Sequence, residues 1–532
     1  MSGLLIPSLL LLATLYALLH HLHLRPRHPR EPPIIPSRLP YLGPLLGMAL
    51  QGGRYLKGIG LANRHLPVFT LPVPFSRMYI VTSPPLAAAV QRASKTLSFT
   101  PLVPDITRRV LGLDEGTARV VRDGVEEEVG FLGDMREMVY GYLGPGARLE
   151  ELSLAAGREL GAQVAGYVRA DLGALAGAGR EVPDLLVWIR HFVAQGTGRL
   201  LYGEENPLAL SSGELEEAFW DFDHGLGGLL AGVWPRLTAR KAYRGRERLV
   251  GAFEGWIEAG RDKGEDVPDI IRERMRIAKE HGFSTQAAAR SEVSFLFAGI
   301  VNTATTTFWT ILQVFARSDL LAGVREEIGR CVDEEGKGEL RLSLEKLKTD
   351  CPILSAVVRE CLRLGSDNYS VRLVKADTEL AGGQYMLKAG GVVQIAGGVI
   401  HADRGVWGGD VDVFDHTRFL KTQQPNGAGQ AEDERERPQV QQTLSGGVHP
   451  AAFRAFGGGR TLCPGRHFAI TEILAFVAVI VLTFEIEAVE GSGRIRIPKK
   501  NDGVLPVHIL EPVEPVRVRV RLREGEPRIV VA

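Results

Sequence analysis

The stretch FGGGRTLCPGRHFA, residues 456–469, is the most informative part of this 532-residue chain. A run of three glycines precedes Cys463, and a proline and a glycine follow it directly. Because glycine has no Cβ, such a backbone can turn through positive φ and approach a flat ligand closely. Proline and glycine then suit a loop that leads into a helix, which we expect over the apolar residues 468–484. The pattern predicts one cysteine held on a stiff loop against a planar partner.

Cys463 has three interpretations at this point. A lone cysteine in a glycine-rich turn is commonly a buried structural side chain. A zinc site could use Cys463 and His467, but structural zinc needs four ligands and the sequence has no further Cys/His cluster. The third interpretation is a thiolate ligand of heme iron, which pushes electron density onto the iron and favours O–O cleavage.

The spacing around the cysteine resembles the heme-binding loop of the cytochromes P450. That loop has phenylalanine, two residues, glycine, three residues, cysteine, one residue and glycine, and here Phe456, Gly459, Cys463 and Gly465 hold these positions. The resemblance implies that Cys463 is the axial ligand of heme b and that the other three residues belong to the cofactor-binding loop. The basic residue expected two positions before the cysteine is absent, and neighbouring Arg460 is the candidate contact for a heme propionate.

A second match lies about a hundred residues before the cysteine, in LSAVVRECLRL. Glu360 and Arg363 are three residues apart, share one face of the expected helix and can pair. An exposed pair of this kind would contribute little to stability. The resemblance instead implies the buried network of the P450 helix K, which is completed by Arg418 in FDHTRFL. Asp415 and His416 depart from the family pattern, so we expect the outer part of this network to differ.

Arg372 follows this motif by nine residues. It lies in a polar–apolar alternation that predicts a strand over residues 369–374. By resemblance, its guanidinium would bind a heme propionate, a task that suits a planar group with a permanent charge.

The resemblance covers the whole chain and implies a mainly α-helical P450 fold with small β-sheets. We expect a transmembrane anchor over residues 1–24, a basic and proline-rich hinge over 25–50, and a heme-thiolate catalytic domain over 51–532. Lysine plus arginine equals aspartate plus glutamate, 63 each, so no global field favours nucleic acid. The four cysteines lack the spacing of a disulfide framework, which fits a reducing compartment.

The N-terminus predicts a single membrane crossing. Residues 3–19 are apolar and uncharged, and as a helix they would span roughly 26 Å of a hydrocarbon core of about 30 Å. A cleaved signal peptide is the alternative, but no basic residue precedes the run and no small-x-small cleavage site follows it. Arg25, Arg27 and Arg30 follow instead, which places the catalytic domain in the cytoplasm. By resemblance to microsomal P450s, the membrane is the endoplasmic reticulum. Residues 225–237 are either a second membrane contact or a buried helix end.

The expected distal helix, residues 289–315, departs from the family. Ala298 and Gly299 match the alanine–glycine pair that lets this helix pass over the heme. The acid and threonine that usually follow, and that relay protons, are replaced by Val301 and Asn302. Valine carries no proton, and asparagine forms hydrogen bonds without ionising readily. The run from Ala298 to Trp309 resembles the P450 branch that includes the sterol 7α- and 12α-hydroxylases and prostacyclin synthase.

This branch contains two chemistries, so two functions stay open. As a monooxygenase, the protein would use O2 and two electrons to oxidise a C–H bond, with Asn302 positioning a proton-donating water and Thr303 beside it. As an isomerase or dehydratase, it would rearrange a peroxide-like substrate without a reductase, with Asn302 orienting the substrate oxygen. A heme-binding membrane protein without turnover is a third class, which the sequence does not exclude.

The expected pocket wall combines the distal helix with the turn before Arg372. Phe295, Ala298 and Gly299 would come from the helix, and Asn368 and Tyr369, together with Asp367, from the turn. Apolar walls with few polar groups suggest a bulky lipophilic substrate of terpenoid, steroid or polyketide type. The loop GGGRTLCPGRHFA resembles that of filamentous-fungal P450s, which implies a role in secondary-metabolite biosynthesis.

The expected electron donor is NADPH–cytochrome P450 reductase. Arg454, Arg460 and Arg466 flank the cysteine and predict a basic patch for an acidic redox partner, unless they are solvated charges or propionate partners. The family's helix C usually carries a tryptophan–x–x–x–arginine signature that contacts a heme propionate. This signature is absent here, and its replacement cannot be assigned from sequence. Residues 422–448 are poor in apolar side chains and predict a flexible surface insertion without catalytic duty.

Overall fold

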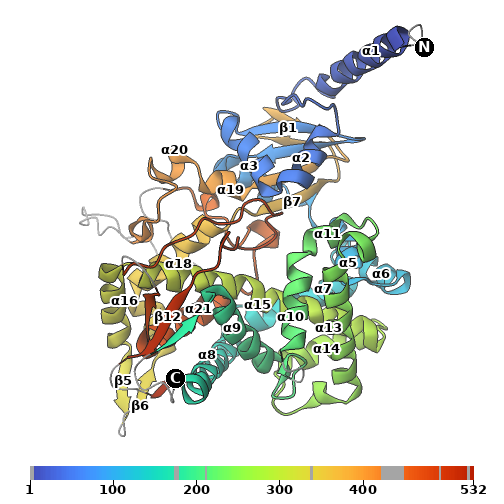
Figure 1. Ribbon diagram of the computed structural model, residues 1–532. Helices are drawn as coiled ribbons and strands as arrows, with labels where there is room; N and C mark the ends of the chain where they lie inside the picture. Colours follow the sequence, from blue (N-terminus) through green and yellow to red (C-terminus); the bar gives the residue numbers. More distant parts are fainter. Residues whose placement is uncertain are drawn as a thin grey trace, which may run out of the picture.

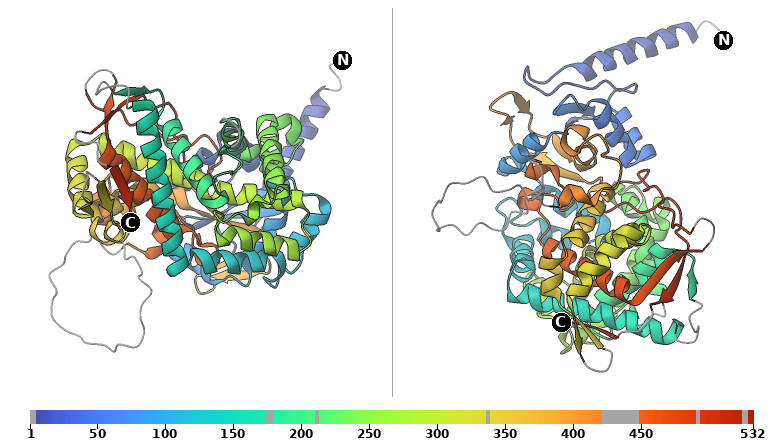
Figure 2. Two further views of the ribbon diagram at one scale, coloured as in Figure 1. Left: turned by 90° about the horizontal axis from the view of Figure 1, so that it is seen from below. Right: turned by 90° about the vertical axis from the view of Figure 1, so that its left-hand side faces the viewer.

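The computed structural model describes residues 5–172, 179–209, 213–335, 339–420, 448–489, 493–523 and 528–532. Packed helices and small sheets form the body of the molecule, and α1 (Leu5–Leu24) projects away from it (Figures 1 and 2). The predicted surface insertion, apart from Val448, and residues 1–4 of the predicted anchor lie outside the described residues.

Helices dominate the described residues, which confirms the predicted fold class. After α1, their bounds are α2 (Gly43–Gln51), α3 (Gly53–Ala62), α4 (Pro84–Arg92), α5 (Val103–Leu111), α6 (Glu115–Arg122), α7 (Gly130–Leu143), α8 (Ala147–Tyr167), α9 (Leu185–Tyr202), α10 (Glu214–His224), α11 (Leu226–Ala231), α12 (Pro235–Thr238), α13 (Arg240–Glu258), α14 (Asp269–Glu280), α15 (Thr285–Phe315), α16 (Ser318–Arg330), α17 (Leu344–Asp350), α18 (Pro352–Gly365), α19 (Gly397–His401), α20 (Arg404–Trp407) and α21 (Arg466–Thr483).

The strands form four small sheets. The largest has the order β1 (Val68–Val73), β2 (Ser76–Val81), β10 (Val392–Ala396), β7 (Tyr369–Val374) and β3 (Leu97–Ser98). Its β2 and β10 run parallel, and its other pairs are antiparallel. The remaining sheets are β11 (Phe484–Ala488), β12 (Val518–Leu522) and β4 (Arg180–Val182); β13 (Arg528–Val531), β6 (Glu339–Leu342) and β5 (Val332–Glu335); and β8 (Thr378–Leu380) with β9 (Tyr385–Leu387).

Helices α15 and α21 form the centre of the helical region. Both are apolar on all sides, as a helix must be when other elements enclose it. Helix α15 contacts α9, α13, α18 and α21. These two helices are also long and apolar enough to cross a membrane, but 72% of each apolar window is buried in the protein. Their apolarity is therefore accounted for by the core.

Several predicted elements are confirmed. The predicted strand over residues 369–374 is β7, and the motif LSAVVRECLRL lies in α18. The apolar run 468–484 forms α21 up to Thr483, and Phe484 begins β11 instead of ending the helix. The distal helix begins at Thr285, four residues before the predicted start, where the side chain of Ser284 caps the amide of Ala287.

The proline-rich hinge is attached to the body. Thr70 Oγ1 on β1 donates to the Pro32 carbonyl at 2.8 Å, and Ile34 forms a β-bridge with Thr70. Glu31 is buried and pairs with Arg77, with 3.4 Å between Oε1 and Nε. Helix α2 begins at Gly43, inside the predicted hinge. These contacts fix residues 31–35 to the largest sheet.

The apolar segment over residues 225–237 divides into two parts. Leu226 and Leu229 on α11 are buried, whereas Trp234 and Leu237 are 75% and 76% exposed. The first part therefore packs as a helix, and the second presents large apolar side chains at the surface.

Candidate functional site

The cysteine loop is held by its own backbone and by α4. The Cys463 amide donates to the Phe456 carbonyl at 3.0 Å. Gly457 and Gly459 have φ values of 76° and 61°, a region that favours glycine. A Cβ at Gly459 would lie 2.9 Å from Cβ of Gln91 on α4. The glycines thus allow a tight turn pressed against a neighbouring helix, and the close approach to a planar ligand stays a prediction.

A cavity of ≈ 430 Å³ lies between this loop and α15. Its walls are mainly apolar and come from α7, α9, α15, α21, the cysteine loop and residues 507–509. The predicted site residues that line it are Phe295, Ala298, Gly299, Asn302, Thr303, Asn368, Phe456, Cys463 and Gly465. The fold therefore brings together two segments that are more than 150 residues apart in the chain.

The lining of this cavity carries few ionisable groups. Among its described lining residues, Cys463 and His508 are the two ionisable side chains. Burial raises the pKa of the Cys463 thiol, and the Gly465 amide and the Arg466 charge oppose this shift. The cavity thus presents one sulfur at the N-terminal end of α21 and one histidine on the opposite, distal side.

Two buried guanidinium groups lie next to the cysteine loop, and neither pairs with a carboxylate of the described residues. Arg372 is 5% exposed and Arg454 is 1% exposed, and neither forms an ion pair within the described part of the chain. Arg372 Nη2 donates to Thr461 Oγ1 at 2.5 Å, and Arg454 Nη2 donates to Ser370 Oγ at 3.2 Å. Burial lowers the pKa of both, and the neighbouring Arg372 charge helps to bring the pKa of Arg454 to about 10.

These observations fit a heme. Two buried cations side by side are costly unless an anion neutralises them. A heme carries two propionates, an iron that takes a thiolate, and a flat apolar macrocycle. The unpaired arginines, Cys463 and the apolar cavity match these three properties. Arg454 was predicted only as part of a basic patch, since nothing in its local sequence shows that it is buried beside Arg372.

The predicted basic patch therefore needs a correction. Arg454 is buried and cannot meet a partner protein. Arg460 is half exposed and pairs with Glu128. Arg466 is partly exposed and donates to the Cys463 carbonyl at 3.1 Å. Ion pairing with Glu128 also draws Arg460 away from the predicted propionate contact.

The helix K pair is buried and joined by Arg418. Arg363 Nη2 lies 2.6 Å from Glu360 Oε1, and both side chains are at most 1% exposed. Arg418 Nε lies 3.5 Å from the same Glu360 oxygen. Burial raises the pKa of Glu360, and the charge and hydrogen bonds of Arg363 oppose the rise. The network predicted by resemblance is thus formed in space.

The altered outer part of this network is rebuilt from other groups. The backbone amide of Asp415 donates to Glu360 Oε1 at 3.2 Å, so its contribution does not depend on its side chain. Asp410 Oδ2 lies 2.6 Å from Arg418 Nη2. Sequence reasoning missed Asp410, although its position in the same segment as Arg418 is a usable signal.

Of the three residues predicted from the turn before Arg372, one lines the cavity. Asn368 lines the cavity and donates through Nδ2 to the Arg454 carbonyl at 3.0 Å. The Tyr369 hydroxyl instead donates to the Gly53 carbonyl at 3.4 Å, and its ring packs on the N-terminal sheet. Asp367 is held by Lys57 and Lys500. The predicted pocket roles of Tyr369 and Asp367 were wrong, because Tyr369 begins β7 and faces the N-terminal sheet, and because the two lysines hold Asp367 ahead of the strand.

The centre of α15 provides the polar groups of the distal wall. Asn302 Oδ1 accepts from the Ile509 amide at 2.9 Å. Thr303 also lines the cavity, and the carboxyl of Glu472 on α21 interacts with Thr303 and with Thr197. Burial raises the pKa of Glu472 to about 8. Sequence reasoning missed Ile509 and Glu472, since both reach the site from distant parts of the chain.

Comparisons with known proteins match this chain to one family. The family model described as "Cytochrome P450" matches residues 256–511. A cytochrome P450 monooxygenase of Hypoxylon pulicicidum is 29% identical over 502 residues, which are 93% of this chain and 90% of the relative. A cholesterol 7-alpha-monooxygenase of Cricetulus griseus is 26% identical over 58% of each chain. A 5-beta-cholestane-3-alpha,7-alpha-diol 12-alpha-hydroxylase of Sus scrofa is 25% identical over 94% of this chain and 95% of the relative. The family model and these relatives support a cytochrome P450 of the microsomal type.

Proposed function

We propose that the protein is a heme-thiolate monooxygenase that oxidises a bulky lipophilic substrate with electrons from NADPH–cytochrome P450 reductase. The substrate class is terpenoid, steroid or polyketide, and the role is secondary-metabolite biosynthesis. The observation that carries the proposal is the cavity that joins one thiol, Cys463, to the polar centre of an otherwise apolar helix, α15.

The residues present assign clear duties around a bound heme. Cys463 would hold the iron. Arg372 and Arg454 would neutralise the propionates, because no described carboxylate pairs with either arginine. When bound, the heme supplies the activation of O2 that no protein side chain provides. The reaction consumes O2, two electrons and two protons, and it yields the hydroxylated product and one water.

The cavity supports a lipophilic substrate. Phe295, Ala298 and Gly299 form a wall without charge, so a polar or ionic molecule would lose hydration without compensation. Asn302 and Asn368 offer isolated polar contacts that can orient an oxygenated substrate. The names of two relatives, a cholesterol 7-alpha-monooxygenase and a cholestane-diol 12-alpha-hydroxylase, refer to molecules of this size and character.

One observation favours a second candidate, a reductase-independent isomerase or dehydratase that rearranges a peroxide-like substrate. No described lining residue of the cavity is a carboxylate, and the position that usually holds an acid is Val301. Asn302 would then orient the substrate oxygen. In the monooxygenase, the same side chain positions a water that supplies protons.

Isotope labelling separates the two functions. Membranes that hold the protein and its reductase would be given NADPH, ¹⁸O2 and a panel of terpenoid and steroid substrates. A monooxygenase incorporates one ¹⁸O per product and requires NADPH. A product that forms without NADPH and without ¹⁸O from the gas would contradict the monooxygenase and establish the isomerase.

For localisation, we propose that α1 anchors the protein in the endoplasmic reticulum with the catalytic domain in the cytoplasm. The helix projects from the body, which it contacts near its C-terminal end, where the buried His23 accepts from Arg77 through its carbonyl (Figure 1). Deleting residues 1–24 should release the protein from membranes and leave its heme spectrum unchanged. A truncated protein that still sediments with membranes would contradict the anchor.

A further inference from the structure

Residues 508–511 are fixed from four helices where the chain passes the distal wall of the cavity. The Leu510 amide donates to the Gly365 carbonyl at 3.0 Å at the end of α18. The Leu510 carbonyl accepts from Trp309 Nε1 on α15 at 2.8 Å. Glu511 pairs with Arg190 on α9, and His508 pairs with Asp223 on α10. The segment is irregular in secondary structure, and side chains hold it in place.

The contact with Ile509 defines the orientation of the Asn302 side-chain amide. A backbone amide can only donate, so the Asn302 atom that meets it at 2.9 Å is the acceptor oxygen. The Nδ2 group therefore lies on the other side of the amide. Asn302 lines the cavity and is exposed to it. The side chain consequently offers the cavity its N–H donors, and its oxygen is occupied by the backbone.

His508 fixes the other half of the Ile509 backbone. Its Nδ1 lies 2.9 Å from the Ile509 carbonyl, and its Nε2 lies 3.2 Å from Asp223 Oδ1. Nδ1 faces a carbonyl and must therefore carry a proton, and a second proton on Nε2 makes the ring an imidazolium that forms an ion pair with the Asp223 carboxylate without an aligned hydrogen bond. The Asp223 carboxylate is buried and has His508 as its ion-pair partner among the described residues.

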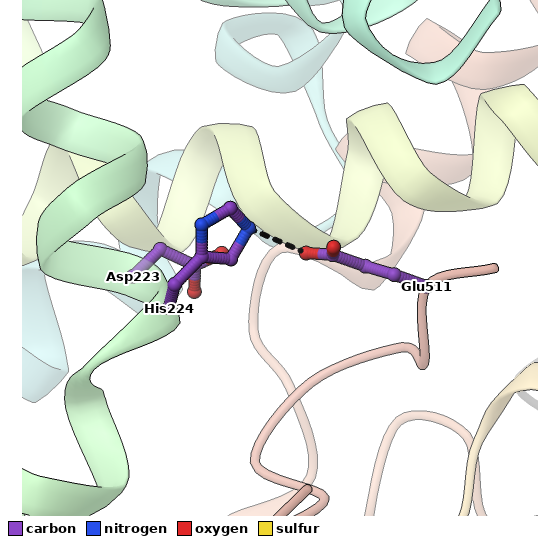
Figure 3. Close-up of side chains that lie close together, drawn as sticks. All are labelled: Asp223, His224 and Glu511. Carbon is purple, nitrogen blue, oxygen red and sulfur yellow. Dashed lines mark ion pairs between the residues drawn. The ribbon is translucent and has the colours of Figure 1, made fainter. Parts of the chain in front are cut away.

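The surrounding charges reinforce this state. Asp223 and, more weakly, Glu511 raise the pKa of His508 against the opposing effect of burial. The other charged or titratable groups nearby are His224 on α10 and Arg190 on α9, and both contact Glu511. Figure 3 shows the dashed ion pair between His224 and Glu511, with Asp223 beside them. Because Arg190 and His508 neutralise the two carboxylates, we interpret this group as an ion-pair cluster.

We propose that the Asp223–His508 pair is a positioning device that holds the Ile509 backbone so that Asn302 presents a fixed hydrogen-bond donor to the cavity. The device rests on the proposed heme site and applies to either chemistry of that site. It selects ligands that place an acceptor oxygen near the centre of α15, such as the oxygen of a carbonyl, hydroxyl or peroxide. Asn302 is the contacting residue, whereas His508 and Asp223 act through the backbone.

The C–O stretching band of the reduced carbon-monoxide complex tests this inference without turnover. A distal donor that interacts with the CO oxygen lowers the stretching frequency, so Asn302→Leu should shift the band to higher frequency. Asp223→Asn and His508→Gln should split the single band of the natural protein in two, because the amide is no longer fixed. Asn302→Asp keeps an acceptor for the Ile509 amide but lacks the donor when ionised, so its band should match that of Asn302→Leu at high pH.

His191→Gln is the matched control. His191 also pairs with a carboxylate, Glu216 at 2.9 Å, and its pKa is also raised by that partner. It is not among the residues that line the cavity, so the control should leave the band unchanged.

A pH series on the natural protein needs no variant. The pKa of His508 is raised, so the imidazolium persists through its unperturbed value and is lost as pH rises through the higher folded value. The band should split above that value, whereas Asp223→Asn should show the split band both below and above it. An unsplit band in both variants, with no pH dependence, would overturn the inference. A natural protein that forms no CO complex would instead contradict the proposed heme site.

Discussion

The two sides of the cavity were predictable to different degrees. The cysteine side is built from short motifs, and each motif contains both partners of its main contact, as in Glu360 and Arg363. The distal side depends on contacts between remote segments, such as the hydrogen bond between Asn302 and Ile509, 207 residues apart. The cysteine side follows the family pattern, whereas the distal side replaces the usual acid and threonine and recruits His508 and Asp223. The comparison indicates that cofactor attachment is retained and that distal chemistry is where this chain diverges.

The largest expected effect is on the cysteine side. Cys463→Ser should abolish the thiolate type of low-spin ferric spectrum, because a serine oxygen cannot replace the sulfur ligand. Electron paramagnetic resonance and heme content would measure this. Cys361→Ala is a suitable control, since Cys361 is buried but does not line the cavity. A thiolate spectrum in Cys463→Ser would refute the ligand assignment.

The next effect is on the buried network of α18. Glu360→Gln leaves Arg363 and Arg418 as buried charges without their carboxylate, which should lower the free energy of unfolding by about 3–5 kcal/mol. Denaturant unfolding of the heme-loaded protein would measure it. The exposed pair Glu326–Arg330 is the control, and Glu326→Gln should change stability by less than about 1 kcal/mol. Equal losses in both variants would show that burial of the network is unimportant.

The next smaller effect concerns Arg454, whose substitution should weaken heme binding without weakening the fold. Arg454→Met removes one of two adjacent buried cations, so the heme-free protein should unfold at the same or a higher temperature. Heme should nevertheless dissociate faster, because a charge-assisted hydrogen bond worth about 1.5–3 kcal/mol is lost. Heme transfer to apomyoglobin would give the rate. Arg460→Met should leave that rate unchanged, since Arg460 pairs with Glu128 at the surface; an equal acceleration would contradict the assignment of Arg454.

The smallest effect is on the distal side. Asn302→Ala removes one neutral hydrogen bond, worth about 0.5–1.5 kcal/mol, so product per NADPH should fall by roughly two- to tenfold. Coupling of NADPH oxidation to product formation is the measurement. Asn368→Ala, which alters a polar group elsewhere on the cavity wall, is the comparison. Unchanged coupling in Asn302→Ala would remove this residue from proton delivery and leave the distal side structural.

The strand β7 and the shared helix face of Glu360 and Arg363 could be predicted because each depends on neighbours in sequence, whereas the fold class and the burial of that pair followed from the family resemblance. The burial of Arg454 and the Asp410–Arg418 contact could not, since burial is set by tertiary packing and not by residue type. Tyr369 shows the same limit: its position beside Asn368 was correct, but its ring packs on the N-terminal sheet. The positioning of Asn302 required knowledge of which distant backbone amide meets its oxygen.

The carbon-monoxide difference spectrum of the reduced protein tests the central claim most directly. The sample would be reduced either by NADPH with reductase or by dithionite. A heme-thiolate at Cys463 that receives electrons from the reductase predicts the strongly red-shifted Soret band under both conditions. The absence of that band under both conditions would contradict the account, because the loop around Cys463 would then not bind heme as a thiolate site.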